Sequence, residues 1–242
     1  MNFILEVIGF TMEGCLAAQN AGAHRLELCD SPADGGTTPS YGFIRAARER
    51  LHIKLFPIIR PRSGDFFYSD EEFEIMKSDV KICKQTGCDG IVTGLLMKDG
   101  TVDKKRCGLL VDHAYPMGVT FHRAFDRTVD PFKALEDILD IGCERILTSG
   151  QQPNAFDGAG LIKELVEKAD DRIVVMPGSG VRSDNIMTIA TATGAVEFHS
   201  SARKKVGSKM DYLNPELKED LTTFSVDEDE IKMMLSLLKN SG

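Results

Sequence analysis

The sequence predicts an α/β fold, a single (β/α)8 TIM barrel with eight parallel strands. Short runs rich in Val, Ile, Leu and Phe recur at intervals of 21 to 35 residues, and they begin near Phe3, His24, Lys54, Asp89, Gly118, Arg145, Ile173 and Ala195. Each interval contains a segment with helical periodicity, as parallel strands joined by crossover helices require. The 242 residues are also close to the roughly 250 that are typical of such barrels.

A doubly wound open sheet is the alternative fold. Such a sheet usually has fewer strands and a glycine fingerprint after the first one, but here the first strand ends Glu6-Val7-Ile8-Gly9-Phe10-Thr11. No linker or change of composition divides the chain. We therefore expect one domain over residues 1–242.

Capping residues mark where the helices begin. Thr11 can cap 12–21, Ser69 with Glu72 forms a capping box for 70–85, and Asp130-Pro131 opens 131–141. The remaining helices are expected over 40–50, 103–115, 158–169 after Asp157, 184–193 after Ser183 or Asp184, and 226–239 after a capping box of Ser225 and Glu228.

One long irregular stretch, about 202–225, follows the last strand. Loops of that length inside a compact domain are uncommon and either cover a functional site or are mobile. We expect one of these two roles for it.

Composition excludes several classes of function. With 29 Lys+Arg against 37 Asp+Glu, the net charge is −8, which argues against binding to nucleic acid and to anionic membrane surfaces. No apolar run approaches the roughly 18–20 residues of a membrane span. The N-terminal residues have no basic region and reach a carboxylate at Glu6, so no signal peptide is expected and the predicted location is cytoplasmic.

Polar residues gather where the predicted strands end. In these barrels the chemistry lies at the C-terminal ends of the strands, which we call the mouth. The residues expected there are Glu6, Glu27, Cys29, Arg60, Arg62, Thr93, His122, Arg123, Ser149, Gly178, Ser179, Gly180, His199 and Ser200. So many charged groups inside a barrel are costly unless they are paired.

Side-chain alternation selects the residues that point inward. By this criterion Glu6, Glu27, Arg60 and His122 face the mouth and can form a connected network. Such a network is either a buried ionic plug or a site where pKa values are tuned for binding or proton transfer. Glu27 and His122 are the candidate acid/base residues.

The other mouth residues suggest an anion site. Gly178-Ser179-Gly180 precede a helix, so their amides can hold an anion or simply form a tight turn, and Ser149 can add to them. The further ligand-binding candidates are Glu6, Arg60, Arg62, Arg123 and His199. No lysine ends a strand, which argues against a Schiff-base aldolase, and two mouth histidines are too few for a three-histidine zinc site.

Six cysteines have no C-x-x-C spacing and are expected to be free and mostly buried. Cys29 is next to the mouth, and a thiolate is a soft ligand that suits Cu(I). It is a candidate metal ligand, although burial as a small apolar residue explains it equally well.

The strand ends resemble those of the copper homeostasis protein CutC family. The resemblance rests on Arg25-Leu26-Glu27-Leu28-Cys29, Arg60-Pro61-Arg62-Ser63-Gly64-Asp65-Phe66, Val119-Thr120-Phe121-His122-Arg123-Ala124-Phe125-Asp126, Val175-Met176-Pro177-Gly178-Ser179-Gly180 and Glu197-Phe198-His199-Ser200-Ser201-Ala202. Together with similar segments it extends from about residue 3 to 202.

The resemblance implies a cytoplasmic barrel, usually a homo-oligomer such as a dimer or tetramer, that is implicated in copper handling and proposed to bind Cu(I) through cysteines, with no established reaction. Cys29 matches one family cysteine. Some members carry another at the end of the first strand, where this chain has Ile8.

Three hypotheses follow. The protein is a copper-binding protein that uses Cys29, or an enzyme that acts on a small anionic metabolite, carrying a phosphate or carboxylate, at the mouth. The third hypothesis is an oligomeric scaffold whose mouth is an ion-paired plug.

Overall fold

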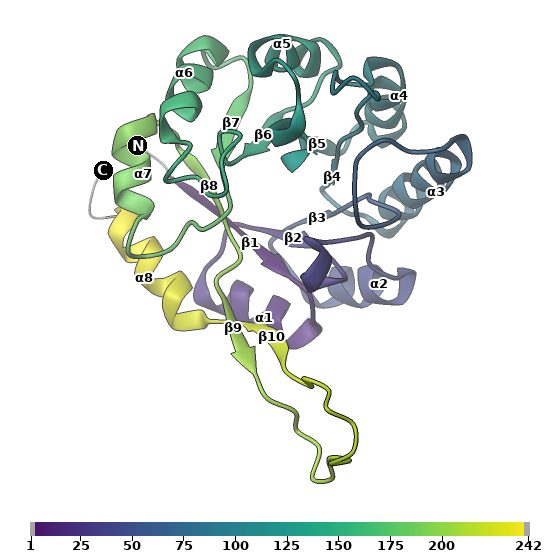
Figure 1. Ribbon diagram of the computed structural model, residues 1–242, viewed down its shortest axis with the longest axis vertical. Coiled ribbons are helices and arrows are strands. Elements are labelled where there is room, and N and C mark those ends of the chain that lie inside the picture. Colours follow the sequence, from purple (N-terminus) through teal and green to yellow (C-terminus); the bar gives the residue numbers. More distant parts are fainter. Residues whose placement is uncertain (1–2, 240–242) are drawn as a thin grey trace.

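The computed structural model describes residues 3–239 and shows a (β/α)8 barrel. Eight short strands form the wall, and a ring of helices surrounds them (Figure 1). The strands are β1 (Ile4–Gly9), β2 (Arg25–Leu28), β3 (Lys54–Pro57), β4 (Gly90–Thr93), β5 (Gly118–Phe121), β6 (Arg145–Thr148), β7 (Val174–Pro177) and β8 (Glu197–Ser200).

Two arcs of parallel strands make up the barrel. One has the order β3-β2-β1-β8 and the other β4-β5-β6-β7. A parallel bridge between Ile58 and Val92 joins β3 to β4, and β7 lies beside β8. Within the first arc Glu6 stands opposite both Arg25 on β2 and His199 on β8, so the register brings these three residues to one level.

The helices cover the outside of the wall with their apolar faces. They are α1 (Met12–Ala21), α2 (Tyr41–Arg50), α3 (Asp70–Thr86), α4 (Lys104–Ala114), α5 (Pro131–Asp140), α6 (Ala159–Ala169), α7 (Ile186–Thr193) and α8 (Glu228–Lys239). The core between helices and wall is built from buried aliphatic and aromatic residues such as Leu5, Leu26, Ile91, Phe121 and Phe198.

Several expected caps are confirmed. Thr11 accepts from the amide of Gly14 at 3.1 Å, Asp130 caps α5, and Ser69 and Glu72 form the reciprocal capping box of α3. Helices α2, α4 and α6 each begin one residue later than predicted, and α7 begins two residues later. Gly158 rather than Asp157 precedes α6, and Asn185 precedes α7.

Two predictions for the C-terminal region were wrong, namely the irregular stretch 202–225 and the start of the last helix at 226. The segment 202–225 is not irregular throughout, because β9 (Arg203–Val206) pairs antiparallel with β10 (Thr223–Val226). Ser225 lies in β10, so it cannot cap the last helix. That helix begins at Glu228, and the Asp227 carboxylate accepts from the Asp229 amide at 3.2 Å.

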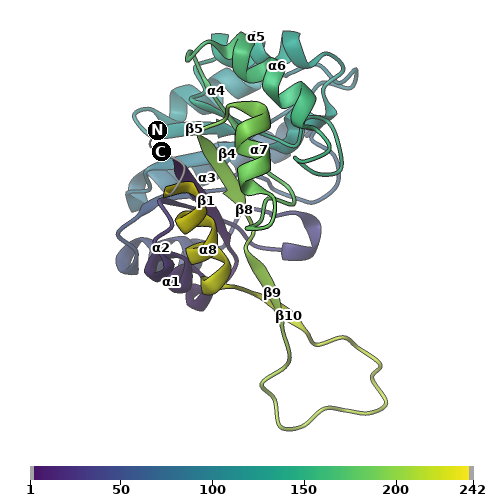
Figure 2. The same ribbon diagram turned by 90° about the vertical axis from the view of Figure 1, so that its left-hand side faces the viewer.

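The rest of the predicted loop, residues 207–222, does not cover the mouth. It projects from the β9–β10 pair away from the barrel (Figures 1 and 2). We call residues 207–222 the arm.

Candidate functional site

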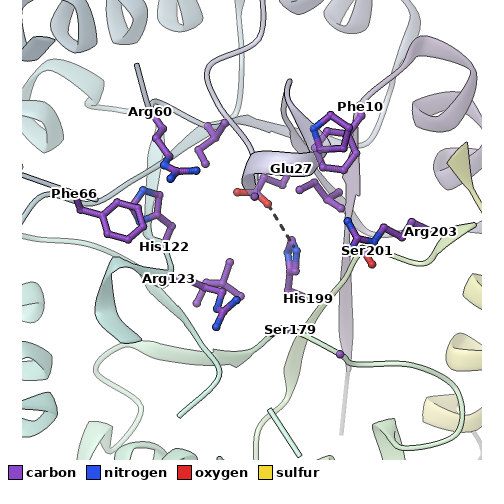
Figure 3. Close-up of a pocket in the computed structure, with 16 residues that line it drawn as sticks. Phe10, Glu27, Arg60, Phe66, His122, Arg123, Ser179, His199, Ser201 and Arg203 are labelled. Atoms are coloured by element: carbon purple, nitrogen blue, oxygen red, sulfur yellow. Dashed lines mark ion pairs between the residues drawn. The ribbon is translucent and has the colours of Figure 1, made fainter. Parts of the chain in front are cut away.

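A cavity of about 220 Å³ opens at the C-terminal ends of the strands. Its walls come from β1, β2, β6 and β8 and from the loops that follow β1, β2, β3, β5, β7 and β8 (Figure 3). The side chains labelled there are Phe10, Glu27, Arg60, Phe66, His122, Arg123, Ser179, His199, Ser201 and Arg203. Carboxylate, imidazole and guanidinium groups therefore share one small space with aromatic side chains.

Glu6 lies below this cavity in a closed ionic layer. It is fully buried, and Arg25 donates to its Oε2 through Nε. Arg25 also donates to Glu197 at 2.7 Å, and Arg145 donates to the same Glu197 oxygen at 2.9 Å. Burial alone would raise the pKa of Glu6, but Arg25 and His199 lower it to about 2. The layer pairs two carboxylates with two guanidinium groups.

His199 connects the ionic layer to the cavity. Its Nδ1 lies 2.8 Å from Glu6 Oε1, and its Nε2 lies 3.7 Å from Glu27 Oε2. Burial works against a charged imidazole, yet the bond to Glu6 and the charge of Glu27 raise the pKa of His199. The two carboxyl groups therefore favour the protonated form of the ring.

Glu27 is the titratable group on the cavity side of this chain. Burial raises its pKa to about 7, and the charge of Glu6 adds to the rise while His199 opposes it. A carboxyl group poised near neutral pH can both accept and donate a proton. The structure therefore places an acid/base-competent carboxyl beside an imidazole at the cavity wall.

His122 has a different character from His199. Its Nδ1 accepts from the Ala124 amide at 3.2 Å, which leaves any ring proton on Nε2. Burial and the nearby Arg60 lower the pKa of His122 to about 3. The ring is neutral at physiological pH and packs against Phe66 at 4.9 Å between centroids. This environment fits a wall residue better than an acid/base group.

The two arginines after β3 form their hydrogen bonds with loop residues. Arg60 lines the cavity, and its terminal nitrogens donate to the carbonyls of Asp34, Gly36 and Gly64 at 2.8–3.0 Å. Arg62 lies outside the cavity lining and donates to Glu72 at 2.5 Å.

Arg123 lines the cavity, and its side chain is 42% exposed. Asp126 and Ser149 orient it through bonds of 2.8 Å each. Ser149 itself is fully buried and also donates to Asp126, so it positions Arg123 and is not part of the lining.

The loop after β7 supplies backbone donors. The amide of Gly178 donates to the carbonyl of Thr148 at 2.9 Å, whereas Ser179 and Gly180 line the cavity. Within residues 3–239 the amides of Ser179 and Gly180 donate no hydrogen bond. Unpaired amides next to Arg123 are suited to an anion.

Cys29 does not line the cavity. It is fully buried, and burial together with the charge of Glu27 raises the pKa of its thiol well above the usual value. The donor atoms close enough to hold a cation come instead from Glu6, Glu27 and His199. Two of these three donors are carboxylate oxygens, which suit Cu(I) poorly, and Glu6 is already paired with Arg25.

Sequence reasoning missed several residues of the site. Arg203 and Ser201 line the cavity, but both follow β8, where only an irregular loop was expected. Asp126, which orients Arg123, and Arg145, which completes the ionic layer, were not singled out either. The alternation of β6 was the available signal for Arg145.

The residues at the strand ends belong to a region that matches a known protein family. The CutC family model matches residues 3–204. A CutC family protein of Chromobacterium violaceum is 52% identical over 212 residues, which cover 88% of this chain and 86% of that protein. The chain belongs to the CutC family.

Other relatives of this CutC family member extend the comparison. A human protein named copper homeostasis protein cutC homolog is 47% identical, over 88% of this chain and 78% of its own length. A crystal structure of a CutC protein from Streptococcus agalactiae superposes with a TM-score of 0.79 at 33% identity, covering 82% of this chain and 98% of that one.

More distant structures share the fold alone. Phosphoribosyl anthranilate isomerase from Thermotoga maritima superposes with a TM-score of 0.63 at 13% identity, covering 98% of this chain and 99% of that one. Among the described residues, none of the helices has the length and apolar character needed to cross a membrane.

Proposed function

We propose that this CutC family member contributes to copper homeostasis, the role in the human relative's name, as an enzyme that acts on a small anionic metabolite. The single observation that carries the proposal is the Glu6–His199–Glu27 chain, which ends at the cavity in a carboxyl group with a pKa of about 7. A purely structural ion pair has no need of a poised proton.

Glu27 is the proposed acid/base group, and His199 is its positioning partner. Glu6 fixes His199 through Nδ1, so the Nε2 side of the ring faces Glu27 (Figure 3). This arrangement lets a proton pass between Glu27 and a bound molecule while the protonated His199 ring offsets the charge that remains.

The groups that can bind an anion line the same cavity as Glu27. Arg123 and Arg203 provide charge, and Ser179 and Gly180 provide amides. The loops after the seventh and eighth strands are the usual phosphate site of this fold. The proposed ligand therefore carries a phosphate or carboxylate group.

Direct Cu(I) binding is the second reading, and the residues of the site do not fit it. All six cysteines are buried, and Cys29 is a high-pKa thiol outside the cavity lining. Free buried thiols do suit a reducing compartment, which supports our proposal of a cytoplasmic location.

Inorganic phosphate is the first probe of the anion site. We expect it to raise the melting temperature of the protein, and we expect Arg123→Ala to reduce this shift by at least half. Glu27→Gln serves as the matched variant in the same cavity and should keep the shift. If phosphate, sulfate and small carboxylates give no shift in any variant, the enzyme proposal loses its support.

Copper is tested separately by anaerobic Cu(I) titration against a competing chelator. Our proposal expects Cys29→Ser to leave the Cu(I) affinity of the protein unchanged. A loss of tight Cu(I) binding in Cys29→Ser would favour the copper-carrier reading.

A further inference from the structure

His122 carries a buried hydrogen-bonding atom that no other group of the described chain satisfies. The residue lines the cavity and is 4% exposed, and within residues 3–239 its Nε2 has no hydrogen-bond partner. Buried polar atoms in folded proteins are paired in the great majority of cases, because an unmade hydrogen bond is costly. An unpaired ring nitrogen at a cavity wall therefore points to a ligand atom as its partner.

The contacts of the other ring edge hold the imidazole in place. The backbone amide of His122 donates to the carbonyl of Thr93 at 2.9 Å, and its Nδ1 accepts from the Ala124 amide. A Cβ on Gly94 would lie 2.7 Å from Nδ1 and 2.9 Å from Cε1, so the glycine makes room for the ring. Because Nδ1 is an acceptor, the proton of the neutral ring is on Nε2. His122 therefore offers one N–H donor that is positioned in advance.

A positive charge lies beside this donor. The Arg60 guanidinium carbon and the His122 ring centroid lie 5.1 Å and 4.9 Å from the centroid of the same Phe66 ring (Figure 3). Burial and the charge of Arg60 lower the pKa of His122 to about 3, which keeps the imidazole neutral. A fixed neutral donor in the field of a cation is suited to an oxygen atom that gains negative charge.

We propose that His122 Nε2–H donates to the carbonyl oxygen of the substrate and that Glu27 transfers a proton at the carbon next to this carbonyl. The inference rests on the proposed function, in which Glu27 is the acid/base group, and it names the substrate class. The substrate is a small carbonyl compound that carries a phosphate or carboxylate group. A carboxylate base combined with a neutral imidazole is a known arrangement for proton transfer next to a carbonyl.

The proposed step is an enolisation. Glu27 in its carboxylate form takes the proton, and the electron pair of the broken C–H bond becomes the C=C bond of the enolate. The π electrons of the carbonyl move onto its oxygen, which accepts from His122 Nε2–H. Return of a proton from Glu27 to the carbon restores the carbonyl. If the Glu27 proton has meanwhile exchanged with solvent, the solvent isotope enters the product.

The cavity agrees with a small substrate of this class. Its volume of about 220 Å³ is below the roughly 300–1,000 Å³ of pockets that hold drug-sized ligands. Arg123, Ser179 and Gly180 line the same cavity and remain for the anionic group. The carbonyl and the anionic group thus have separate partners.

Deuterium exchange in D₂O tests the proposal on the full chain. The probes are dihydroxyacetone phosphate and pyruvate, which combine a ketone and its neighbouring C–H bonds with a phosphate and a carboxylate. Proton NMR should show that the wild type exchanges the hydrogens next to the ketone of at least one probe. Glu27→Gln should lose this exchange. The probe that exchanges identifies the anionic group.

His122→Phe keeps a ring and removes the donor. Loss of one donor to a developing oxyanion costs about 10²–10³ in rate, so exchange should slow by about 100-fold or more. His122→Gln again offers an N–H and should recover part of the rate. The control Arg62→Ala, outside the cavity lining, should exchange like the wild type. The phosphate-induced melting shift should survive in His122→Phe, because Arg123 is untouched.

Ligand affinity of the wild type tests the same donor without any variant. Phosphoglycolohydroxamate and oxalate are planar mimics of the two enolates, and glycerol 3-phosphate and lactate carry the same anionic groups without the ketone. Calorimetry should show that at least one mimic binds at least about a hundredfold more tightly than its control.

Three outcomes would overturn the inference, and they differ in what they leave of the proposed function. If phosphate raises the melting temperature but neither probe exchanges and neither mimic is preferred, the carbonyl substrate is wrong and the anion site stands. Equal exchange in the wild type and His122→Phe would contradict the role of His122 and support Glu27 as the acid/base group. If no anion binds, the proposed function fails and the inference fails with it.

Discussion

Two layers of charged residues lie inside this barrel, and they differ in how completely they are paired. In the lower layer, Glu6 and Glu197 meet Arg25 and Arg145 at hydrogen-bond distance. In the upper layer, Glu27 faces His199 across 3.7 Å and borders an open cavity. The lower layer is a structural plug, and the upper layer retains a group that can exchange a proton. We therefore base the proposed function on the incompletely paired charges at the cavity, and not on buried charge as such.

The largest effect is expected in the lower layer. Arg25→Met removes the guanidinium that binds both Glu6 and Glu197 and leaves Glu6 with His199 and Glu197 with Arg145. Breaking a buried ion network by removing one member costs about 3–5 kcal/mol of unfolding free energy. Urea denaturation measures this loss. Arg45→Met removes an exposed pair with Glu49 and should leave the unfolding free energy close to its wild-type value. A loss below about 1 kcal/mol for Arg25→Met would mean that the layer is not the plug described above.

Gly178 tests how tightly the upper layer is packed. A Cβ there would lie 2.4 Å from Leu147 Cδ1 and 3.3 Å from His199 Cβ. Gly178→Ala should destabilise the protein by about 1–3 kcal/mol through overpacking and should displace His199 from Glu27. Gly42→Ala, in an open position on α2, should be neutral or stabilising. Equal stability of the two variants would contradict tight packing, because Leu147 and the end of β7 would then shift to accept the added methyl group without cost.

The pH dependence of stability separates the two layers. Glu27 and His199 both have raised folded pKa values, so their contributions to stability are present at low pH. The contribution of Glu27 is lost as pH rises through about 7, and that of His199 is lost as pH rises through its own raised pKa. Glu6, with a pKa of about 2, contributes above its ordinary pKa and loses that contribution on acidification. The wild type should therefore be more stable near pH 5 than near pH 8. Chemical denaturation should show a flatter profile for Glu27→Gln, by about 1–2 kcal/mol. If Glu27→Gln has the same pH profile of stability as the wild type, the raised pKa of Glu27 is contradicted.

The smallest effect is expected for Arg62. Its contacts with Glu72 and Asp65 are partly exposed, so Arg62→Ala should change stability by less than about 1 kcal/mol. The phosphate-induced melting shift should also stay at its wild-type value, in contrast to Arg123→Ala. A large loss of phosphate response in Arg62→Ala would require the loop after β3 to reorganise around the ligand.

Strand alternation accounts for what the sequence could predict. It placed Glu27, Arg60 and His122 around one mouth, and the structure brings these residues to one cavity. Alternation could not predict that Arg60 would donate its hydrogen bonds to loop carbonyls, because those contacts depend on how two loops fold together. Nor could it reveal Arg203, because the β9–β10 pair is created by contacts between segments separated by the arm.

The helix predictions failed where local signals competed. Ser225 and Glu228 have the spacing of a capping box, but Ser225 pairs with Lys204 in the β9–β10 ladder, so the tertiary pairing overrides the local cap. The two histidines show the same limit. Both lie at strand ends, yet the pKa of His199 is raised by its two carboxyl neighbours and the pKa of His122 is lowered to about 3 by burial and a nearby arginine.

The central claim is that the upper layer holds a carboxyl group poised near neutral pH. Carbon-13 NMR of the glutamate side-chain carboxyls tests it, with Glu27→Gln to assign the signal. We predict one glutamate that titrates near pH 7 and disappears in Glu27→Gln, while Glu6 stays ionised down to about pH 2. If Glu27 instead titrates with the exposed glutamates, near its model-peptide value of about 4.3, the proposed acid/base role is contradicted.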